Sequence, residues 1–95
     1  MVKKNNKNNS FDYIIYVRSG CMYCNNAIEL VKNKGLNANI INCDAFINKD
    51  KEEFIKYMKN IIGKEYRYMP MIFKNNKFIG GFNELEKNIN KLKKI

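Results

Sequence analysis

The sequence predicts a single α/β domain, in which helices cover both faces of a mixed four-stranded sheet. Three observations lead to this fold class. Segments with strand character alternate with segments of helical periodicity along most of the chain. The last two strand-like segments are separated by a short Asn-rich turn, which indicates an antiparallel hairpin. The length of 95 residues allows one domain with a modest core.

The first half of this domain predicts a strand–helix–strand unit. Residues 11–17 are almost continuously apolar, as in a central strand that is buried on both faces. Apolar side chains recur with helical spacing in residues 25–34, and Gly35 follows as a stop signal. Residues 36–43 form the next strand-like segment. A helix that crosses between two such strands makes a right-handed unit with parallel strands.

A second helix is predicted over residues 49–62, after a connection at residues 44–48. Gly63 is its expected end. Its expected buried face carries four apolar side chains: Phe54, Met58, Ile61 and Ile62.

The hairpin and a final helix complete the chain. Residues 71–73 and 78–79 are the expected hairpin strands, and they are joined through two asparagines, which tolerate positive φ. Asn83 is the predicted N-cap of the last helix, with Glu86 completing a capping box. The expected buried stripe of this helix consists of Leu85, Ile89 and Leu92.

Two cysteines lie where the first strand ends and the first helix begins. The first N–H groups of a helix lack partners and carry partial positive charge, so a thiolate at Cys21 is stabilised there and becomes a better nucleophile. Cys24 follows three residues later on the apolar face of the helix and can reach back to form a disulfide. We expect Cys21 to be exposed and Cys24 to face inward. The pair predicts a redox site.

Composition limits the other function classes. The net charge of +9 comes almost entirely from scattered lysines, which favours a solvated basic surface over a nucleic-acid site. Cys43 is expected to be a core thiol. A structural zinc site is disfavoured because the chain has only three cysteines and no histidine. Residues 1–10 are polar and predict a disordered tail without a secretory signal, so residues 11–95 form the domain and a cytoplasmic location is expected.

Three segments resemble the glutaredoxin family of the thioredoxin fold. They are Tyr16–Cys24, with its C-x-Y-C motif, Tyr68–Phe73, with a proline, and Ile79–Leu85, with a Gly-Gly pair. They occur in the family's order and at its spacing. The resemblance implies a thioredoxin-like (glutaredoxin) fold and a glutathione-dependent thiol–disulfide oxidoreductase, which reduces glutathione mixed disulfides and protein disulfides.

The resemblance also implies roles for individual residues. Cys21 matches the nucleophile and Cys24 the resolving cysteine, while Arg18 matches a cation that meets a glutathione carboxylate. Pro70 matches the family's cis-proline, whose neighbour Met69 would pair with the cysteinyl part of glutathione.

Further residues are implied near the last helix. Gly81 would allow close approach of the ligand. Phe82 and Asn83 would offer N–H groups to the γ-glutamyl carboxylate, and Asn83 or Glu84 would take its ammonium group. Tyr23 has either a packing role or a role in the glutathione groove.

Two alternatives to this function are left open, and the first comes from a departure from the family pattern. Met22 stands where the family usually has a proline, and relatives without that proline sometimes bridge a [2Fe-2S] cluster between two subunits through the first cysteine and glutathione, which here would be Cys21. The second alternative is a thioredoxin-like reductant that a flavoenzyme supplies with electrons.

Tyr68 and Met69 replace a common Thr-Val pair, which predicts a more apolar groove. The expected partners are glutathione and disulfide-bonded proteins, with no membrane or specific nucleic acid, and the protein is expected to be a monomer.

Overall fold

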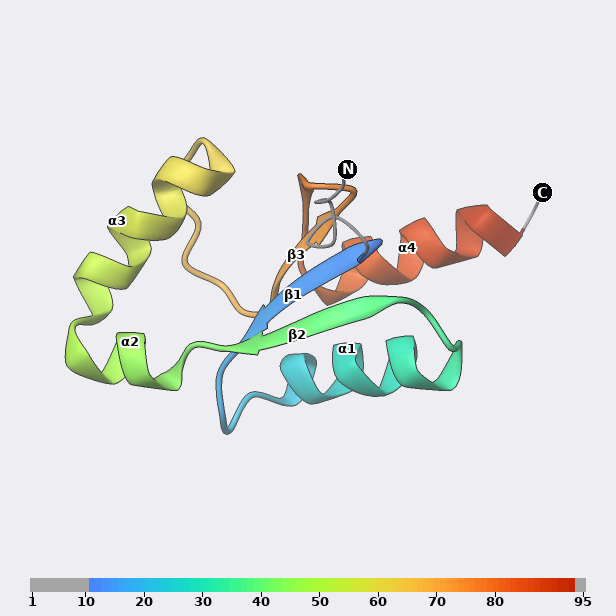
Figure 1. Cartoon of the computed structure of the whole chain (residues 1–95), viewed down its shortest axis with the longest axis horizontal. Coiled ribbons are helices and arrows are strands. Elements are labelled where there is room, and N and C mark those ends of the chain that lie inside the picture. The colour runs from blue at the N-terminus through green and yellow to red at the C-terminus, as the bar shows by residue number, and fades with distance from the viewer. Residues whose placement is uncertain (1–10, 94–95) are drawn as a thin grey trace, which may run out of the picture.

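The computed structural model describes residues 11–93, with side chains described as far as Lys91. The predicted tail and the side chain of Leu92 lie outside the described residues. The chain follows the order β1 (Tyr13–Val17), α1 (Met22–Asn33), β2 (Ala38–Asn42), α2 (Asp44–Lys49), α3 (Lys51–Ile62), β3 (Met71–Lys74), β4 (Lys77–Gly80) and α4 (Phe82–Lys93) (Figure 1). Within the described part, no helix has the length and apolar character that a membrane span requires.

The four strands form one mixed sheet, as the sequence predicts. Their spatial order is β2-β1-β3-β4, so β1 is central. It pairs in parallel with β2 and antiparallel with β3, while β3 and β4 form the antiparallel hairpin. The hairpin turn has Asn75 at φ 49° and Asn76 at φ 68°, which confirms the expected use of asparagine at positive φ.

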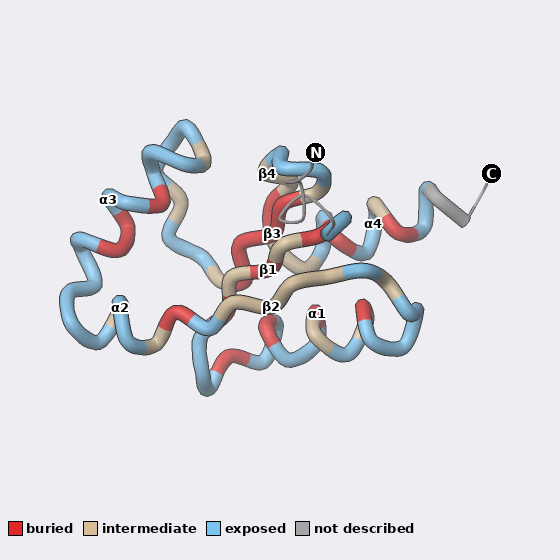
Figure 2. The backbone as a smooth tube through the Cα atoms, viewed as in Figure 1, coloured by how far each residue is buried: buried red, intermediate tan, exposed pale blue. Residues whose placement is uncertain are grey.

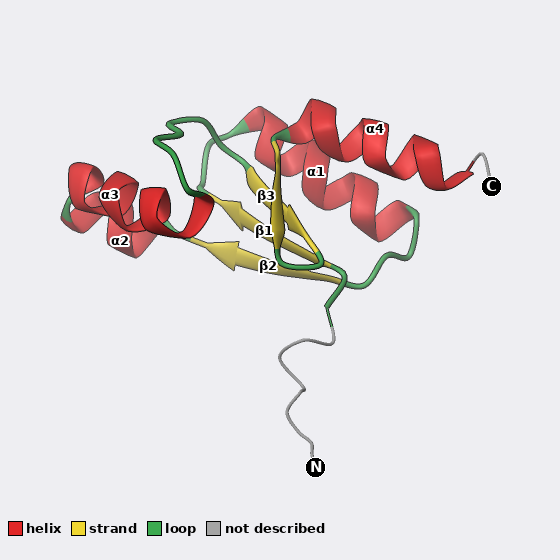
Figure 3. Ribbon diagram, turned by 90° about the horizontal axis from the view of Figure 1, so that it is seen from above, coloured by secondary structure: helices red, strands yellow, loops and turns green. Residues whose placement is uncertain are grey.

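Alternate side chains of β1 point to opposite faces of the sheet and join different clusters. Tyr13, Ile15 and Val17 are buried on the face that α1 and α4 cover (Figures 2 and 3). The helices contribute buried apolar side chains to the same cluster, among them Ala27, Val31, Leu85 and Ile89. This period-two alternation is the reason that the first strand reads as apolar throughout.

The opposite face packs against α3. Met71 and Phe73 of β3 join Phe54, Ile55 and Met58 in a second buried cluster. The predicted stripe on this helix is partly wrong. Ile61 is 44% exposed, because the contact face of α3 is centred on the 54–55–58 positions and is rotated away from it.

The predicted connection at residues 44–48 is wrong, because α2 occupies Asp44–Lys49. A helix of this length shows too little periodicity to be recognised in the sequence. It is anchored by Phe46, whose ring centroid lies 5.4 Å from that of Phe54 and 5.5 Å from that of Tyr57.

The predicted starts of two helices are also corrected. Helix α3 begins after Asp50, whose carboxylate accepts the Glu53 N–H at 3.1 Å. Helix α4 begins at Phe82, so Asn83 lies inside it and is not its N-cap. Glu84, and not Glu86, reaches back, and its Oε1 accepts the Gly81 N–H at 2.9 Å.

Candidate active site

Cys21 is the N-cap of α1. Its backbone is extended, with φ −119° and ψ 112°, and its Sγ accepts the Cys24 N–H at 3.1 Å. Such a contact directs one of the unpaired N–H groups of the helix at the sulfur, where it stabilises a thiolate. Cys21 is only 6% exposed, so the expectation of an exposed sulfur is wrong. The capping contact draws the side chain back onto the helix, where it joins the core cluster under α1 and α4.

Cys24 is fully buried in the same cluster, as predicted. Burial raises the pKa of its thiol to about 12, and the hydrogen bond with Cys21 adds to this effect. The Cys24 side chain is therefore a neutral thiol at physiological pH.

The Met69–Pro70 peptide lies across the site from α1. Its bond is cis, as the resemblance implies. The Met69 carbonyl oxygen is 3.9 Å from the Cys21 Sγ and accepts its weak hydrogen bond. No hydrogen bond within residues 11–93 engages the Met69 N–H. A backbone donor and acceptor beside the sulfur are the groups that an extended peptide ligand pairs with.

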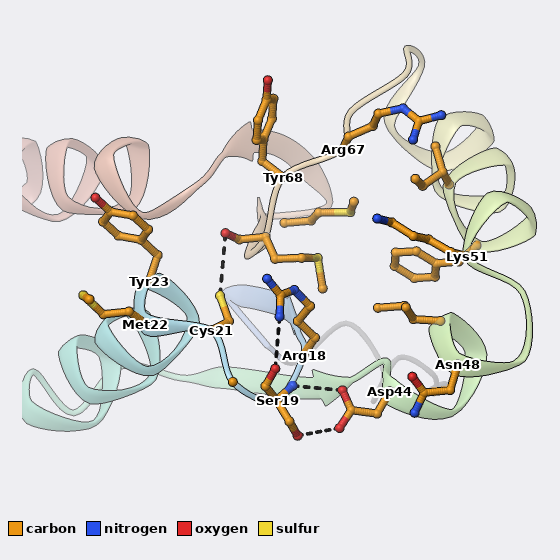
Figure 4. Close-up of a pocket in the computed structure, with 16 residues that line it drawn as sticks. Arg18, Ser19, Cys21, Met22, Tyr23, Asp44, Asn48, Lys51, Arg67 and Tyr68 are labelled. Carbon is orange, nitrogen blue, oxygen red and sulfur yellow. Dashed lines mark hydrogen bonds between the residues drawn. The ribbon is translucent and has the colours of Figure 1, made fainter.

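A cavity of about 670 Å³ opens beside Cys21, between the start of α1 and helices α2 and α3. Arg18 extends into it, and its Nη1 donates to the Ser19 carbonyl at 3.1 Å (Figure 4). Lys51 points in from α3. Arg67 also lines it, but its guanidinium is bound to two carboxylates, Glu52 and Glu65, at 2.8 and 2.6 Å.

A smaller hollow of about 270 Å³ continues from this cavity towards α4. The two share Tyr23, Tyr68 and Met69. The rest of the hollow is lined by Tyr66, by Gly81 directly before α4, and by the first three residues of that helix, which are Phe82, Asn83 and Glu84. The structure thus brings together every residue that the resemblance assigns to glutathione binding except Pro70, which is fully buried.

Aromatic side chains form the wall of the smaller hollow. Tyr23 is 58% exposed and its ring centroid is 6.3 Å from that of Phe82. Tyr66 packs edge-on against Tyr68 and Phe78, at centroid distances of 5.6 and 4.8 Å. Tyr66 was not predicted as a site residue, because nothing in its local sequence shows that the loop folds back towards α4.

Two polar residues at the site were also missed. The Ser19 N–H donates to Asp44 Oδ1 at 2.9 Å, and the Ser19 hydroxyl donates to Oδ2. These bonds hold the pKa of the Asp44 carboxyl below its usual range, the hydroxyl contributing most. The partners are far apart in sequence, so no local pattern could have paired them. Cys43, directly before Asp44, is buried in the second cluster as predicted.

The fold and the site together define a class of protein. A buried dithiol begins the first helix of a mixed four-stranded sheet, and the peptide before a cis-proline faces it. This arrangement is that of a thioredoxin-like thiol–disulfide oxidoreductase.

The particular family follows from the comparison with known families. The model of the family described as Glutaredoxin matches residues 13–79, well over half of the chain, and the chain belongs to this family. No curated protein sequence matches the chain.

Solved glutaredoxin structures are similar to the whole domain. Glutaredoxin 1 from Francisella tularensis, in complex with cacodylate, has 26% identity and a TM-score of 0.71, over 87% of this chain and 96% of that one. Wheat glutaredoxin has 26% identity and a TM-score of 0.65, over 86% and 71% of the two chains. A buckwheat glutaredoxin–glutathione complex, at 22% identity and a TM-score of 0.69 over 87% and 72%, shares the fold.

Proposed function

We propose that this glutaredoxin is a glutathione-dependent oxidoreductase that reduces glutathione mixed disulfides and protein disulfides. The observation that carries the proposal is the position of the Cys21 sulfur. It accepts an N–H of α1 at 3.1 Å and lies beside the Met69 carbonyl, at the edge of a groove. The structure of the buckwheat glutaredoxin is that of its complex with glutathione, which supports glutathione as the thiol that this chain uses.

The proposed reaction with a mixed disulfide uses Cys21 alone. The Cys21 thiolate attacks the glutathione sulfur of the mixed disulfide, the old S–S bond breaks, and the target leaves as a thiolate that takes a proton from water. A second glutathione thiolate then attacks the Cys21–glutathione disulfide. Glutathione disulfide leaves, and the Cys21 thiolate is restored.

A protein disulfide requires Cys24 as the resolving thiol. After Cys21 has attacked, the Cys24 sulfur attacks the Cys21 side of the mixed disulfide, releases the reduced protein and forms the Cys21–Cys24 disulfide. The pKa of Cys24 in the reduced form is raised mainly by burial, and further by its hydrogen bond with Cys21 and by the Cys21 charge. The two effects of Cys21 disappear once Cys21 is in a disulfide, so that part of the rise is relieved when the Cys24 thiolate is needed.

The groove offers contacts for each part of a tripeptide thiol. Arg18 supplies a cation for one carboxylate, and the Met69 N–H and carbonyl supply strand-like pairing. The first N–H groups of α4, at Phe82 and Asn83, suit the second carboxylate. Glu84 already caps Gly81, so it presents the remainder of its carboxylate to an ammonium group.

Reduction of a glutathionylated peptide tests the proposal. Glutathione, glutathione reductase and NADPH supply the electrons, and the reaction is followed by loss of NADPH for the wild type, Cys21→Ser and Cys24→Ser. We expect Cys21→Ser to be inactive, because it lacks the nucleophile, and Cys24→Ser to keep substantial activity, because the mixed disulfide needs only one thiol.

The comparison with a protein disulfide completes the test. Cys24→Ser is expected to lose insulin reduction while it keeps the peptide reaction. A wild type that forms its disulfide but draws no electrons from glutathione would refute glutathione dependence and favour a flavoenzyme as the electron source. The iron–sulfur hypothesis stays a prediction, which the colour and iron content of the protein purified with glutathione would test.

A further inference from the structure

The loop that precedes the nucleophile is held by the Asp44 carboxylate. Residues 18–20 join β1 to Cys21, and Ser19 is exposed to solvent. Ser19 makes two hydrogen bonds to another element, and both end on Asp44, one from its N–H at 2.9 Å and one from its hydroxyl. Figure 4 shows both bonds at the edge of the cavity.

Asp44 is itself fixed to the sheet. It is the first residue of α2, and its N–H donates to Asn42 Oδ1 at 2.8 Å. Asn42 is the partner of Val17 in the β1–β2 register, and the Cys43 N–H donates to the Val17 carbonyl at 2.8 Å. The sheet, Asp44 and the loop thus form one continuous chain of contacts.

The bonds to Ser19 use both oxygens of the Asp44 carboxylate. The lowered pKa of Asp44 agrees with this, since the Ser19 hydroxyl and N–H both favour the charged form. The same cavity is lined by Cys21. A negative charge near a thiolate opposes its formation, so Asp44 does not activate the sulfur through its charge.

We propose that Asp44 is a positioning residue for the reaction: through Ser19 it holds residues 18–20 so that Cys21 sits at the helix N-terminus and Arg18 faces the cavity. The inference rests on the proposed role of Cys21 as the nucleophile. It does not depend on glutathione. A misplacement of about 1 Å at a reacting group can lower a rate by about 100-fold, so a held loop matters to catalysis.

The test is insulin reduction with dithiothreitol as the electron donor, measured as kcat/KM. We expect Asp44→Ala to lower it by between about tenfold and 100-fold. Ser19→Ala, which keeps the N–H bond, should lower it less. Asp44→Asn keeps one acceptor for that N–H and should recover part of the loss. Glu29→Ala removes the same charge from the exposed side of α1 and should have no effect.

Two further measurements separate positioning from charge and from folding. The rate at which iodoacetamide modifies Cys21, located by mass spectrometry, should not rise in Asp44→Ala. The double variant with Ser19→Ala should be no slower than Asp44→Ala alone, because both remove the same contact. The denaturant midpoint is measured for each variant, and Asp44→Asn replaces Asp44→Ala if the latter unfolds.

The outcomes are distinct. A faster alkylation together with unchanged or faster insulin reduction in Asp44→Ala would overturn the inference, since it would show that only the charge acts. Additive losses in the double variant would overturn it as well.

The Cys21→Ser variant is measured in the same assay and separates the two proposals. If Cys21→Ser stays active, the proposed nucleophile is wrong. If Cys21→Ser is inactive and Asp44→Ala is fully active, the positioning role alone is refuted.

Discussion

At the scale of single residues, Glu84 joins the stability of α4 to the shape of the candidate site. Its Oε1 accepts the Gly81 N–H at 2.9 Å, which satisfies a donor at the helix start beside the smaller hollow. We expect Glu84→Ala to lower the free energy of unfolding by about 0.5–1.5 kcal/mol, because that hydrogen bond is lost. Glu84→Gln keeps an acceptor and should lower it by less. Urea denaturation measures both.

The control for this prediction is Glu86→Ala, which removes the same charge from the next turn and should leave stability nearly unchanged. Equal losses in Glu84→Ala and Glu86→Ala would show that charge at the start of α4, and not the capping contact, supports the helix.

Site residues could be predicted from the sequence where they lie in a short local motif. They could not be predicted where their role depends on a contact with a residue that is distant in the sequence. Cys21, Cys24 and the Met69–Pro70 peptide lie in short motifs, and the structure places them together. Ser19 and Asp44 are paired only by folding, and their contact was missed. The exposure of Cys21 was mispredicted for a different reason: its burial depends on how its side chain turns back onto α1 to cap the helix.

At the scale of elements, the hairpin turn is the clearest case of a local signal that decides structure. Asn75 and Asn76 both have positive φ, as a two-residue turn of this kind requires. We expect Asn76→Ala to lower the free energy of unfolding by about 1–2 kcal/mol, because a Cβ without a local polar partner is disfavoured there. Asn76→Gly is the matched control and should stay close to the wild type. If both variants are equally destabilised, the asparagine side chain, and not its backbone conformation, supports the turn.

Other elements show the limit of periodicity as a signal. The strands and the long helices were predicted with their correct order, because each buries a regular stripe of side chains. Helix α2 was missed because it is too short to show a stripe and is anchored through Phe46 to Phe54 and Tyr57 of the next helix. The start of α3 was misplaced because Asp50 caps it through a contact that follows directly after α2.

At the scale of the whole molecule, two buried thiols, those of Cys24 and Cys43, and two half-buried phenols, those of Tyr16 and Tyr66, make the fold sensitive to alkaline pH. Burial raises the pKa of Cys43, Tyr16 and Tyr66, and raises that of Cys24 from 9.0 to about 12. A raised pKa means that the folded chain holds the proton more tightly than the unfolded chain does. The stability linked to Cys24 is therefore complete below about pH 9 and is lost as pH rises towards 12.

This linkage predicts the pH dependence of unfolding. In the presence of a reductant, the urea midpoint of the wild type should be nearly constant from neutral pH to about pH 9 and should then fall. Cys24→Ala removes one of the titrating groups, so its midpoint, although lower throughout, should fall less steeply in the same range. The pH dependence linked to Asp44 has the opposite sign, since its lowered pKa gives stability that is present at neutral pH and lost in acid.

The alkaline range provides the decisive comparison. Curves of the urea midpoint for the wild type and Cys24→Ala that run parallel above pH 9 would contradict the linkage. They would mean that the Cys24 proton is bound equally in the folded and unfolded chains. Cys24 in the reduced protein would then ionise as readily as an exposed thiol, and its pKa would not distinguish it as a protected resolving thiol.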